Sequence, residues 1–279
     1  MNQTVEIICV GNELLIGKTL NTNAQWLTKR ITNLGLATRR VTVVGDDIDE
    51  ISAAIQEAIQ RSPSFLLTTG GLGPTFDDKT LEGLAKALGR RIEVNEEALK
   101  RVKEKYLSYA REGRMEAPEL TPARVKMAKL PEGAAPLPNP VGTAPAVLMK
   151  QENVTVIALP GVPSEMKSIF DESVASVMKQ VARDVTFFET SIEATRVMES
   201  EMAPLIDKVM QNNLHVYIKS HPKGTEKVPH IEFHLSTTAK DTSIARQHVS
   251  KALIQLTELI QEKGGRIKPA KPKLEPPKS

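Results

Sequence analysis

Residues 65–80 read FLLTTGGLGPTFDDKT, an apolar run followed by a turn that holds three glycines and two adjacent aspartates. The run Phe65–Thr69 predicts a buried strand, and Leu81, Leu84 and Leu88 recur after the turn with the period of an amphipathic helix. A glycine-rich turn between a strand and a helix N-terminus presents backbone N–H groups that bind phosphate. The stretch therefore predicts both a βα unit and a phosphate site.

The same alternation of strand and helix extends to both sides of this stretch. It indicates βαβ units, so we expect an α/β fold over residues 1–182: a three-layer αβα domain with a doubly wound, mostly parallel sheet. Residues 131–145 are rich in Pro and Gly and predict a shaped loop. The other predicted strands are residues 5–10, 38–44, 146–149 and 154–159, and the helices fall at about 20–34, 51–59, 95–111, from Thr121-Pro122 and after Pro163.

The pattern changes after residue 182. Strand-like runs and two helical patterns follow in the order βαββα, which predicts a small α+β sandwich domain over residues 183–262. Residues 263–279, KGGRIKPAKPKLEPPKS, carry six Lys or Arg and one Glu and have little to bury. We expect them to form a basic, disordered tail.

Composition excludes several classes of protein. The 279 residues carry a net charge of +3, and without the tail's 6 − 1 = +5 the body carries 31 − 33 = −2, unlike the basic face of nucleic-acid binders. The run at residues 5–10 is far shorter than the roughly 20 residues of a membrane helix. The single cysteine, Cys9, can form no internal disulfide. We expect a cytoplasmic protein that contacts no membrane, and nucleic acid at most weakly through its tail.

Carboxylates follow several of the predicted strands. Ligands of doubly wound sheets bind beyond the carboxyl ends of the strands, where GNELLIGKTLNTN, GDD and LPGVPSE also lie. Glu13, Asp46 and Asp47, together with Asp77 or Asp78, would form an acidic rim that faces the glycine-rich turn. A divalent cation such as Mg²⁺ would reconcile the acids with a bound diphosphate.

Each candidate also has a structural interpretation. The glycines can simply shape a turn, Asp77 or Asp78 can cap the helix after it, and Asp47 or Asp49 can cap the next helix upstream. The turn is not a P-loop, because no Lys-Ser or Lys-Thr pair follows its glycines at the required spacing.

Two further features point away from other chemistries. Ser164 precedes a helix and is surrounded by no G-x-S-x-G elbow, so we interpret it as a helix cap and reject a serine hydrolase. His230 and His234 share one strand face about 13 Å apart, too far for one metal. We expect them on a solvated face.

Four stretches, GNELLIGKTLNTNAQWL, TTGGLGPTFDDKT, NPVGTAP and LPGVPSEM, resemble in sequence and order the CinA family (competence/damage-inducible protein A). Its main domain resembles the molybdopterin-binding domains of molybdenum cofactor biosynthesis. The resemblance implies a homo-oligomer, dimeric or larger, that cleaves ADP-ribose to AMP and ribose 5-phosphate with a divalent metal (Mg, Mn or Co). Many bacterial members continue into a deamidase domain, whereas this chain resembles the shorter archaeal form, so we expect no deamidase activity.

The resemblance also implies roles for residues at matching positions. Asp77 and Asp78 match positions that support metal or water. Together with the acids that follow the other strands, this gives Asp78, Asp77 and Glu13 as catalytic candidates and Glu13, Asp46 and Asp78 as candidate metal ligands. One departure is Asn12, where relatives in the broader superfamily often carry Asp or Thr. The substrate-binding set is Thr69, Gly70, Gly71, Gly73, Pro74, Thr75, Asn21, Asn23, Asn139, Gly142, Thr143, Gly161, Ser164 and Glu165.

Three functions follow from these observations. The first is a metal-dependent nucleotide pyrophosphatase that cleaves ADP-ribose-like diphosphates. The second is a molybdopterin- or nucleotide-binding protein of molybdenum cofactor metabolism on the same fold. The third is a non-catalytic nucleotide-binding module, which the number of acids in the predicted site disfavours.

Overall fold

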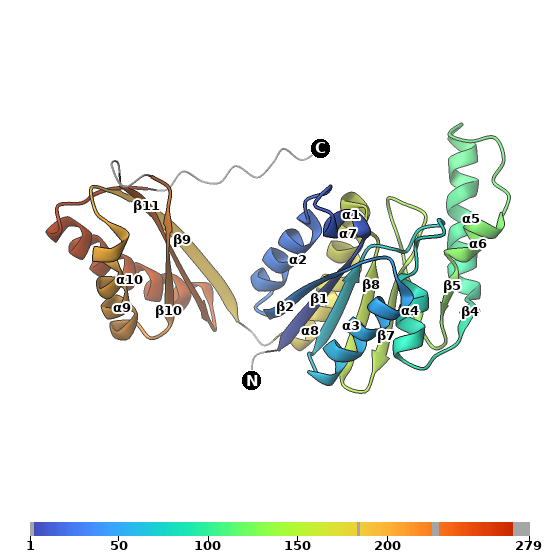
Figure 1. The fold of residues 1–279 in the computed structure, drawn as a ribbon, viewed down its shortest axis with the longest axis horizontal. Coiled ribbons are helices and arrows are strands. Elements are labelled where there is room, and N and C mark those ends of the chain that lie inside the picture. Colours follow the sequence, from blue (N-terminus) through green and yellow to red (C-terminus); the bar gives the residue numbers. More distant parts are fainter. Residues whose placement is uncertain (1–2, 183–184, 225–228, 270–279) are drawn as a thin grey trace. The chain divides into compact units, whose positions relative to one another are not determined.

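The computed structural model describes residues 3–182, 185–224 and 229–269 (Figure 1). The chain divides into two units, Met1–Arg183 and Asp184–Ser279. No helix in these described ranges is both long enough and apolar enough to cross a bilayer.

The first unit is built on a six-stranded sheet of order β2-β1-β3-β8-β7-β6. β2, β1, β3 and β8 pair in parallel, whereas β7 is antiparallel to β8 and β6 is antiparallel to β7. The expected α/β class with a mostly parallel sheet is confirmed. The strands are β1 (Thr4–Val10), β2 (Ala37–Val44), β3 (Phe65–Thr69), β6 (Ala135–Leu137), β7 (Ala146–Gln151) and β8 (Val154–Leu159).

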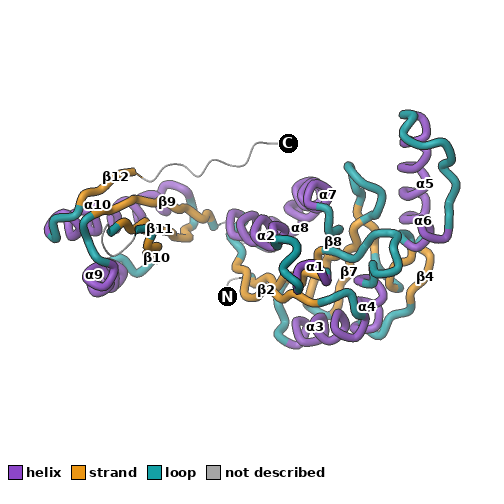
Figure 2. The backbone as a smooth tube through the Cα atoms, turned by 45° about the horizontal axis from the view of Figure 1, so that its top comes forward, coloured by secondary structure: helices purple, strands orange, loops and turns teal. Residues whose placement is uncertain are grey.

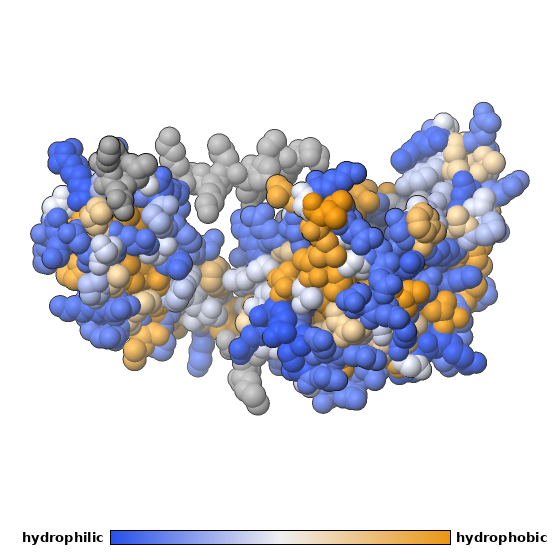
Figure 3. All heavy atoms as spheres, viewed as in Figure 1, coloured by the Kyte–Doolittle hydropathy of each residue, from blue (hydrophilic) through white to orange (hydrophobic). Residues whose placement is uncertain are grey.

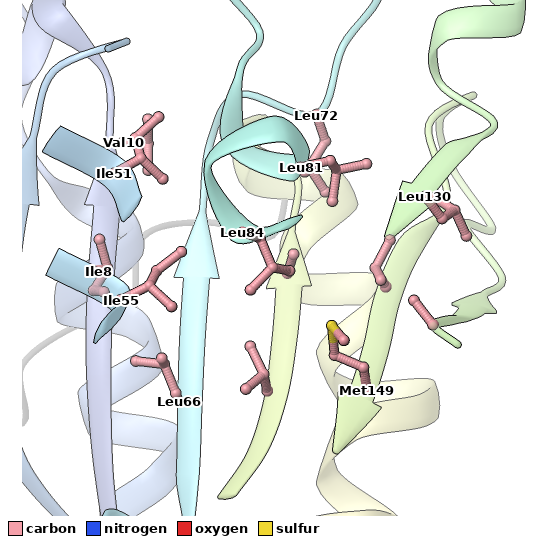
Figure 4. Packing of buried hydrophobic residues seen from close by; sticks show 14 of the residues in the cluster. Ile8, Val10, Ile51, Ile55, Leu66, Leu72, Leu81, Leu84, Leu130 and Met149 are labelled. Atoms are coloured by element: carbon pink, nitrogen blue, oxygen red, sulfur yellow. The ribbon is translucent and has the colours of Figure 1, made fainter. Parts of the chain in front are cut away.

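Helices cover both faces of this sheet because its central strands are apolar on both sides. Along β1, Ile8 and Val10 pack into one core cluster (Figure 4). Ile7 and Cys9 pack into the other. Helices α3 (Ile48–Gln60) and α4 (Thr80–Ala87) cover the first side. The second side is covered by α2 (Thr22–Asn33), α7 (Pro163–Ile169), the π-helical turn η1 (Phe170–Val174) and α8 (Ala175–Val181).

A helical arm interrupts the alternation between α4 and β6. It holds α5 (Glu96–Arg111) and α6 (Pro122–Lys126), flanked by a two-stranded ribbon of β4 (Ile92–Val94) and β5 (Lys129–Pro131). Figures 1 and 2 both show α5 projecting beyond the sheet. Asn95 caps α5 and Thr121 caps α6, with Pro122 in its first turn as predicted.

Two sequence-based expectations for this unit are wrong. Residues 131–145 do not form a loop throughout, because β6 pairs with β7; Pro136 is tolerated since β6 is an edge strand. Leu20 lies outside the helix predicted to begin there. The Asn21 side chain accepts from the Ala24 N–H at 3.0 Å, so α2 starts at Thr22 and Leu20 is 85% exposed.

The second unit is an antiparallel sheet of order β10-β11-β9-β12 with two helices. Side chains from the sheet and both helices share one apolar core that includes Phe233, Ile206 and Leu256. The predicted α+β character is confirmed. The elements are β9 (Thr186–Thr195), α9 (Glu199–Asn212), β10 (Val216–Pro222), β11 (His230–Ala239), α10 (Thr242–Glu262) and β12 (Arg266–Pro269).

The prediction of a tail disordered from residue 263 is wrong for β12. Ile267 packs partly against the core of the unit, and the strand pairs with the edge of β9 over Arg266–Pro269. Ile267 lies between the exposed residues Arg266 and Lys268. Because successive side chains of a strand point to opposite faces, Ile267 can face the core while both basic side chains face away from it. Residues 270–279 of the predicted tail lie outside the described residues.

The two histidines of β11 are about one-third exposed, and each has its own carboxylate partner. His230 Nε2 lies 3.2 Å from Glu193, and His234 Nε2 lies 3.2 Å from Glu189. Both histidines thus lie on a partly solvated strand face, and the spacing argument against a shared metal stays a prediction.

Candidate active site

A cavity of about 440 Å³ opens at the carboxyl ends of β1, β3 and β8. Its walls come from the segments that follow these strands and from the residues around the start of α2, with short contributions from Asp46 after β2, Met127, Thr143 and Ala144. This is the edge at which doubly wound sheets bind ligands.

Most of the predicted site residues meet in this cavity. Thr75, Asn139, Gly142 and Ser164 are the members of the predicted set that do not line it. The lining members are Glu13, Asn21, Asn23, Asp46, Thr69, Gly70, Gly71, Gly73, Pro74, Asp77, Asp78, Thr143, Gly161 and Glu165.

The glycines form a floor that no side chain could occupy. Gly70 has φ +108°, and a Cβ there would lie 2.2 Å from the carbonyl oxygen of Val10. Gly71 has φ +64°, and a Cβ there would lie 2.3 Å from Thr80 Oγ1. The Gly70 N–H donates to Leu159 O at 3.0 Å, so Gly70 contributes close backbone approach and not a free donor. Any cradle of N–H groups must therefore come from the residues after it.

Asn23 joins two walls of the cavity. Its Nδ2 donates to Thr69 Oγ1 at 3.1 Å and to Gly161 O at 2.8 Å, while the Thr69 hydroxyl donates to Pro160 O at 3.0 Å. The end of β3, the segment after β8 and the start of α2 are thus held in one arrangement.

The acidic turn of residues 75–78 is closed on itself. Asp78 Oδ2 accepts from the Thr75 N–H at 2.8 Å, and the Thr75 hydroxyl contacts the carboxylates of both Asp77 and Asp78. The Thr75 hydroxyl and the N–H of Asp77 itself hold the Asp77 pKa below its usual value, with smaller contributions from nearby lysines. Neither aspartate caps α4, whose N-cap is Lys79 without a side-chain bond, so the capping interpretation is wrong for both.

A second acidic group follows β1 and β2. Asp46 Oδ2 accepts from the Asn12 N–H at 2.8 Å, and the Asp46 N–H donates to Asn12 Oδ1 at 3.3 Å. The Glu13 carboxylate lies over Gly11, where a Cβ would come within 2.5 Å of it. Asp47 caps α3 through the N–H groups of Asp49 and Glu50, which lower its pKa, so its capping interpretation is confirmed.

The carboxylates do not form a ready-made metal cage. Within the part of the chain that the structure describes, no group of three or more His, Cys, Asp or Glu is placed to hold a metal ion. Asp46 and Asp78 each have one oxygen engaged by a backbone N–H. Glu13, Asp46 and Asp78 thus offer separate oxygen donors around one cavity, which suits a cation that takes most of its ligands from phosphate and water.

Of residues 139–144, Thr143 and Ala144 line the cavity, and the residues before them hold one of its walls in place. Asn139 Nδ2 donates to Glu165 Oε2 at 2.6 Å and to Ala144 O at 2.8 Å, while Asn139 Oδ1 accepts from the Gly142 N–H at 2.7 Å. A Cβ on Gly142 would lie 2.0 Å from the Glu165 carboxylate. Asn139 and Gly142 therefore support the pocket without lining it.

Ser164 is the predicted site residue with the least support. It is exposed in the first turn of α7, and the N-cap of that helix is Val162, without a side-chain bond. The interpretation of Ser164 as a cap is therefore wrong as well, since α7 begins one residue before it.

The mouth of the cavity carries exposed apolar side chains. Leu20 and Val162 line the cavity and are 85% and 51% exposed, and Phe76 on the acidic turn is 88% exposed. Figure 3 shows apolar surface over the region of α1 (Asn12–Leu15), where Leu15 and Ile16 are exposed. The site thus combines a backbone floor, acidic walls and an apolar rim.

Sequence reasoning missed two residues that organise this site. Thr80 Oγ1 donates to Gly70 O at 2.8 Å, and Lys126 Nζ donates to the carbonyl oxygens of Thr75 and Asp78. Thr80 ends the TTGGLGPTFDDKT stretch, so its position in that motif was a usable signal. Lys126 lies far along the chain and gave none.

Comparisons with known proteins agree with this architecture. The model of the family described as "Probable molybdopterin binding domain" matches residues 6–180. A crystal structure of the protein CinA, of unknown function, from Thermoplasma acidophilum is 41% identical, with a TM-score of 0.57, and the match covers 63% of this chain and 98% of that one.

Two relatives match along both units. A protein of Pyrobaculum aerophilum is 46% identical over 262 residues, 93% of this chain and 95% of its own length. A protein of Sulfurisphaera tokodaii is 41% identical over 263 residues, 94% of this chain and 97% of its own length. Each of these matches therefore extends over both units.

Proposed function

We propose that this chain, which belongs to the family of probable molybdopterin binding domains, is a nucleotide pyrophosphatase, the activity that its resemblance to the CinA family implies. Its substrates would be diphosphates of the ADP-ribose type, cleaved to AMP and a sugar phosphate. The observation that carries the proposal is the backbone floor at Gly70 and Gly71 inside a cavity that also holds Glu13, Asp77 and Asp78.

The parts of the cavity suit different parts of such a substrate. The glycine floor admits a diphosphate close to the backbone, and the exposed Leu20 and Val162 at the mouth suit a planar ring. A cavity of about 440 Å³ lies within the usual range for small-molecule sites, roughly 300–1,000 Å³.

Hydrolysis requires water to attack one phosphorus while the bridging P–O bond breaks. The bridging oxygen leaves on the other phosphate, and a carboxylate near the water accepts its proton. Asp78 and Glu13 are the candidates for that carboxylate, because both line the cavity beside the glycine floor. A divalent cation, when bound, would neutralise the phosphates and be held by Glu13, Asp46 and Asp78.

A pterin-binding role is the second candidate, favoured by the family to which the chain belongs. A pterin is also planar and, in the form that gives the family its description, carries a phosphate, so the same floor and rim would accommodate it. The fold cannot separate the two candidates, because function depends on the site.

Product analysis tests the proposal. The purified chain is incubated with ADP-ribose, NAD and ATP, with and without Mg²⁺, Mn²⁺ or Co²⁺, beside Asp78→Asn and the exposed control Glu93→Gln. We expect metal-dependent release of AMP from ADP-ribose by the wild type and the control, and its loss in Asp78→Asn. An absence of cleavage in every combination overturns the pyrophosphatase proposal. Wild-type turnover by Asp78→Asn would leave Asp78 only the role of closing the turn.

The homo-oligomer implied by the resemblance to CinA is also a proposal. Light scattering of the full chain after gel filtration tests it, with a mass of twice 30.6 kDa or more expected. A monomer mass at micromolar concentration contradicts it.

A further inference from the structure

The anion-binding turn has one positive charge of its own, Lys79, which lies at the N-cap of α4 and does not line the cavity. The turn has no lysine at the P-loop position, and its own carboxylates, Asp77 and Asp78, would repel a phosphate. A site that binds a diphosphate beside two carboxylates needs a cation in addition to backbone N–H groups.

Lys126 brings such a charge from another part of the chain. Its Nζ donates to Asp78 O at 2.7 Å and to Thr75 O, although it lies 48 and 51 residues away from them. Lys126 is the last residue of α6, and the next residue, Met127, is almost fully buried and lines the main cavity. Helix α6 before Lys126 and the buried Met127 after it thus fix the backbone at this position.

The hydrogen bonds of Lys126 go to no carboxylate, although Asp78 and Glu82 line the small void beside it. Both of its acceptors are neutral carbonyl oxygens, and among the ion pairs of the described residues none involves Lys126. The side chain is half-buried behind the turn, in a void of about 10 Å³ lined also by Gly71, Gly73 and Lys129. Salt screens a partly buried charge less than an exposed one. The charge of Lys126 can therefore act on a ligand on the other side of the turn.

We propose that Lys126 is a positioning residue that also provides a positive charge for this anion site. It holds the carbonyl oxygens of Thr75 and Asp78 and so sets the path of the turn, and its ammonium group offsets the aspartates toward a bound diphosphate. It takes the place that an in-loop lysine has in a P-loop, but from the opposite side of the turn. The ligand is accordingly a group with at least two negative charges.

Binding of inorganic pyrophosphate to the full chain, measured by calorimetry, tests this inference without requiring turnover. The variants are Lys126→Met, which removes charge and donors, Lys126→Gln, which keeps donors, and Lys126→Arg, which keeps both. Lys129→Met is the matched control, since Lys129 is exposed and lines the same void.

We expect Lys126→Met to weaken pyrophosphate binding about 10- to 100-fold, the usual effect of losing a hydrogen-bonded charge. Lys126→Gln should stay weak, Lys126→Arg should recover most of the affinity, and Lys129→Met should bind like wild type. The salt dependence of binding should also fall in Lys126→Met and Lys126→Gln, which a purely structural role would not cause. Hydrogen exchange should rise within residues 70–80 of Lys126→Met.

The outcomes separate this inference from the pyrophosphatase proposal, on which it rests only for the choice of ligand. Pyrophosphate binding without any hydrolysis would overturn the enzyme activity and leave the role of Lys126 intact. Equal affinity and salt dependence in wild type and folded Lys126→Met would overturn the role of Lys126. Failure of the wild type to bind pyrophosphate would overturn it too.

Discussion

Asn23→Asp tests whether one amide holds the cavity together. The substitution keeps the shape of the side chain but places an oxygen where Nδ2 donates to Gly161 O at 2.8 Å and to Thr69 Oγ1 at 3.1 Å. Gly161 O can only accept, so that bond is lost. The Thr69 hydroxyl can turn toward the new carboxylate only by leaving Pro160 O. Of the three hydrogen bonds, two are lost whichever way the hydroxyl turns.

The magnitude follows from these bonds. At about 0.5–1.5 kcal/mol each, the loss lowers the free energy of unfolding by about 1–3 kcal/mol. For a unit of this size, each kcal/mol shifts the melting temperature by about 2–4 °C, so we expect a decrease of about 2–12 °C. Loosening of the segment after β8 should also weaken pyrophosphate binding.

Thermal unfolding by circular dichroism and calorimetric binding of pyrophosphate measure both effects. Gln25→Glu is the matched control, because it makes the same amide-to-carboxylate change at an exposed position of α2. A melting temperature and pyrophosphate affinity for Asn23→Asp equal to those of Gln25→Glu would refute the reasoning.

Three other substitutions test separate parts of the structure. Arg61→Ala should lower the free energy of unfolding by about 3 kcal/mol in urea titrations, because it strips the partner, at 2.8 Å, from the buried carboxylate of Glu6; a change under about 0.5 kcal/mol contradicts this. Gly142→Ala should cost about 1.5–3 kcal/mol and raise the Kd for pyrophosphate, since its Cβ displaces the Glu165 carboxylate from its hydrogen bond; unchanged melting would show that Glu165 finds another partner. Ser164→Ala should change neither stability nor turnover, and a loss of turnover would return this exposed serine to the site.

The strands at the centre of the sheet could be predicted closely because they are buried on both faces. Phe65–Thr69 and Val154–Leu159 are short, mostly apolar runs rich in aliphatic residues, and both have the predicted bounds. The edge strand β6 was missed because its partner residues lie in β7, and Pro136 locally argues against a strand. The tail strand β12 was missed for the same reason, since only pairing with β9 explains it.

The candidate site could be predicted as a set of segments but not as a set of contacts. Topology alone brings the glycine-rich turn, the acids and residues 160–165 to one edge. The role of Asp78 depends on how the backbone turns at Gly73, which places Thr75 against its carboxylate. Lys126 reaches the turn only through the packing of α6, so no local pattern predicts it.

The most direct test of a diphosphate site on the glycine-rich turn is an NMR titration of the ¹⁵N-labelled full chain with ADP-ribose and Mg²⁺, followed through its backbone amides. We predict saturable shifts at Gly71, Gly73 and Gly161, with amides of the second unit unchanged. No shift at these glycines at millimolar ADP-ribose, or shifts confined to other parts of the chain, would contradict the account.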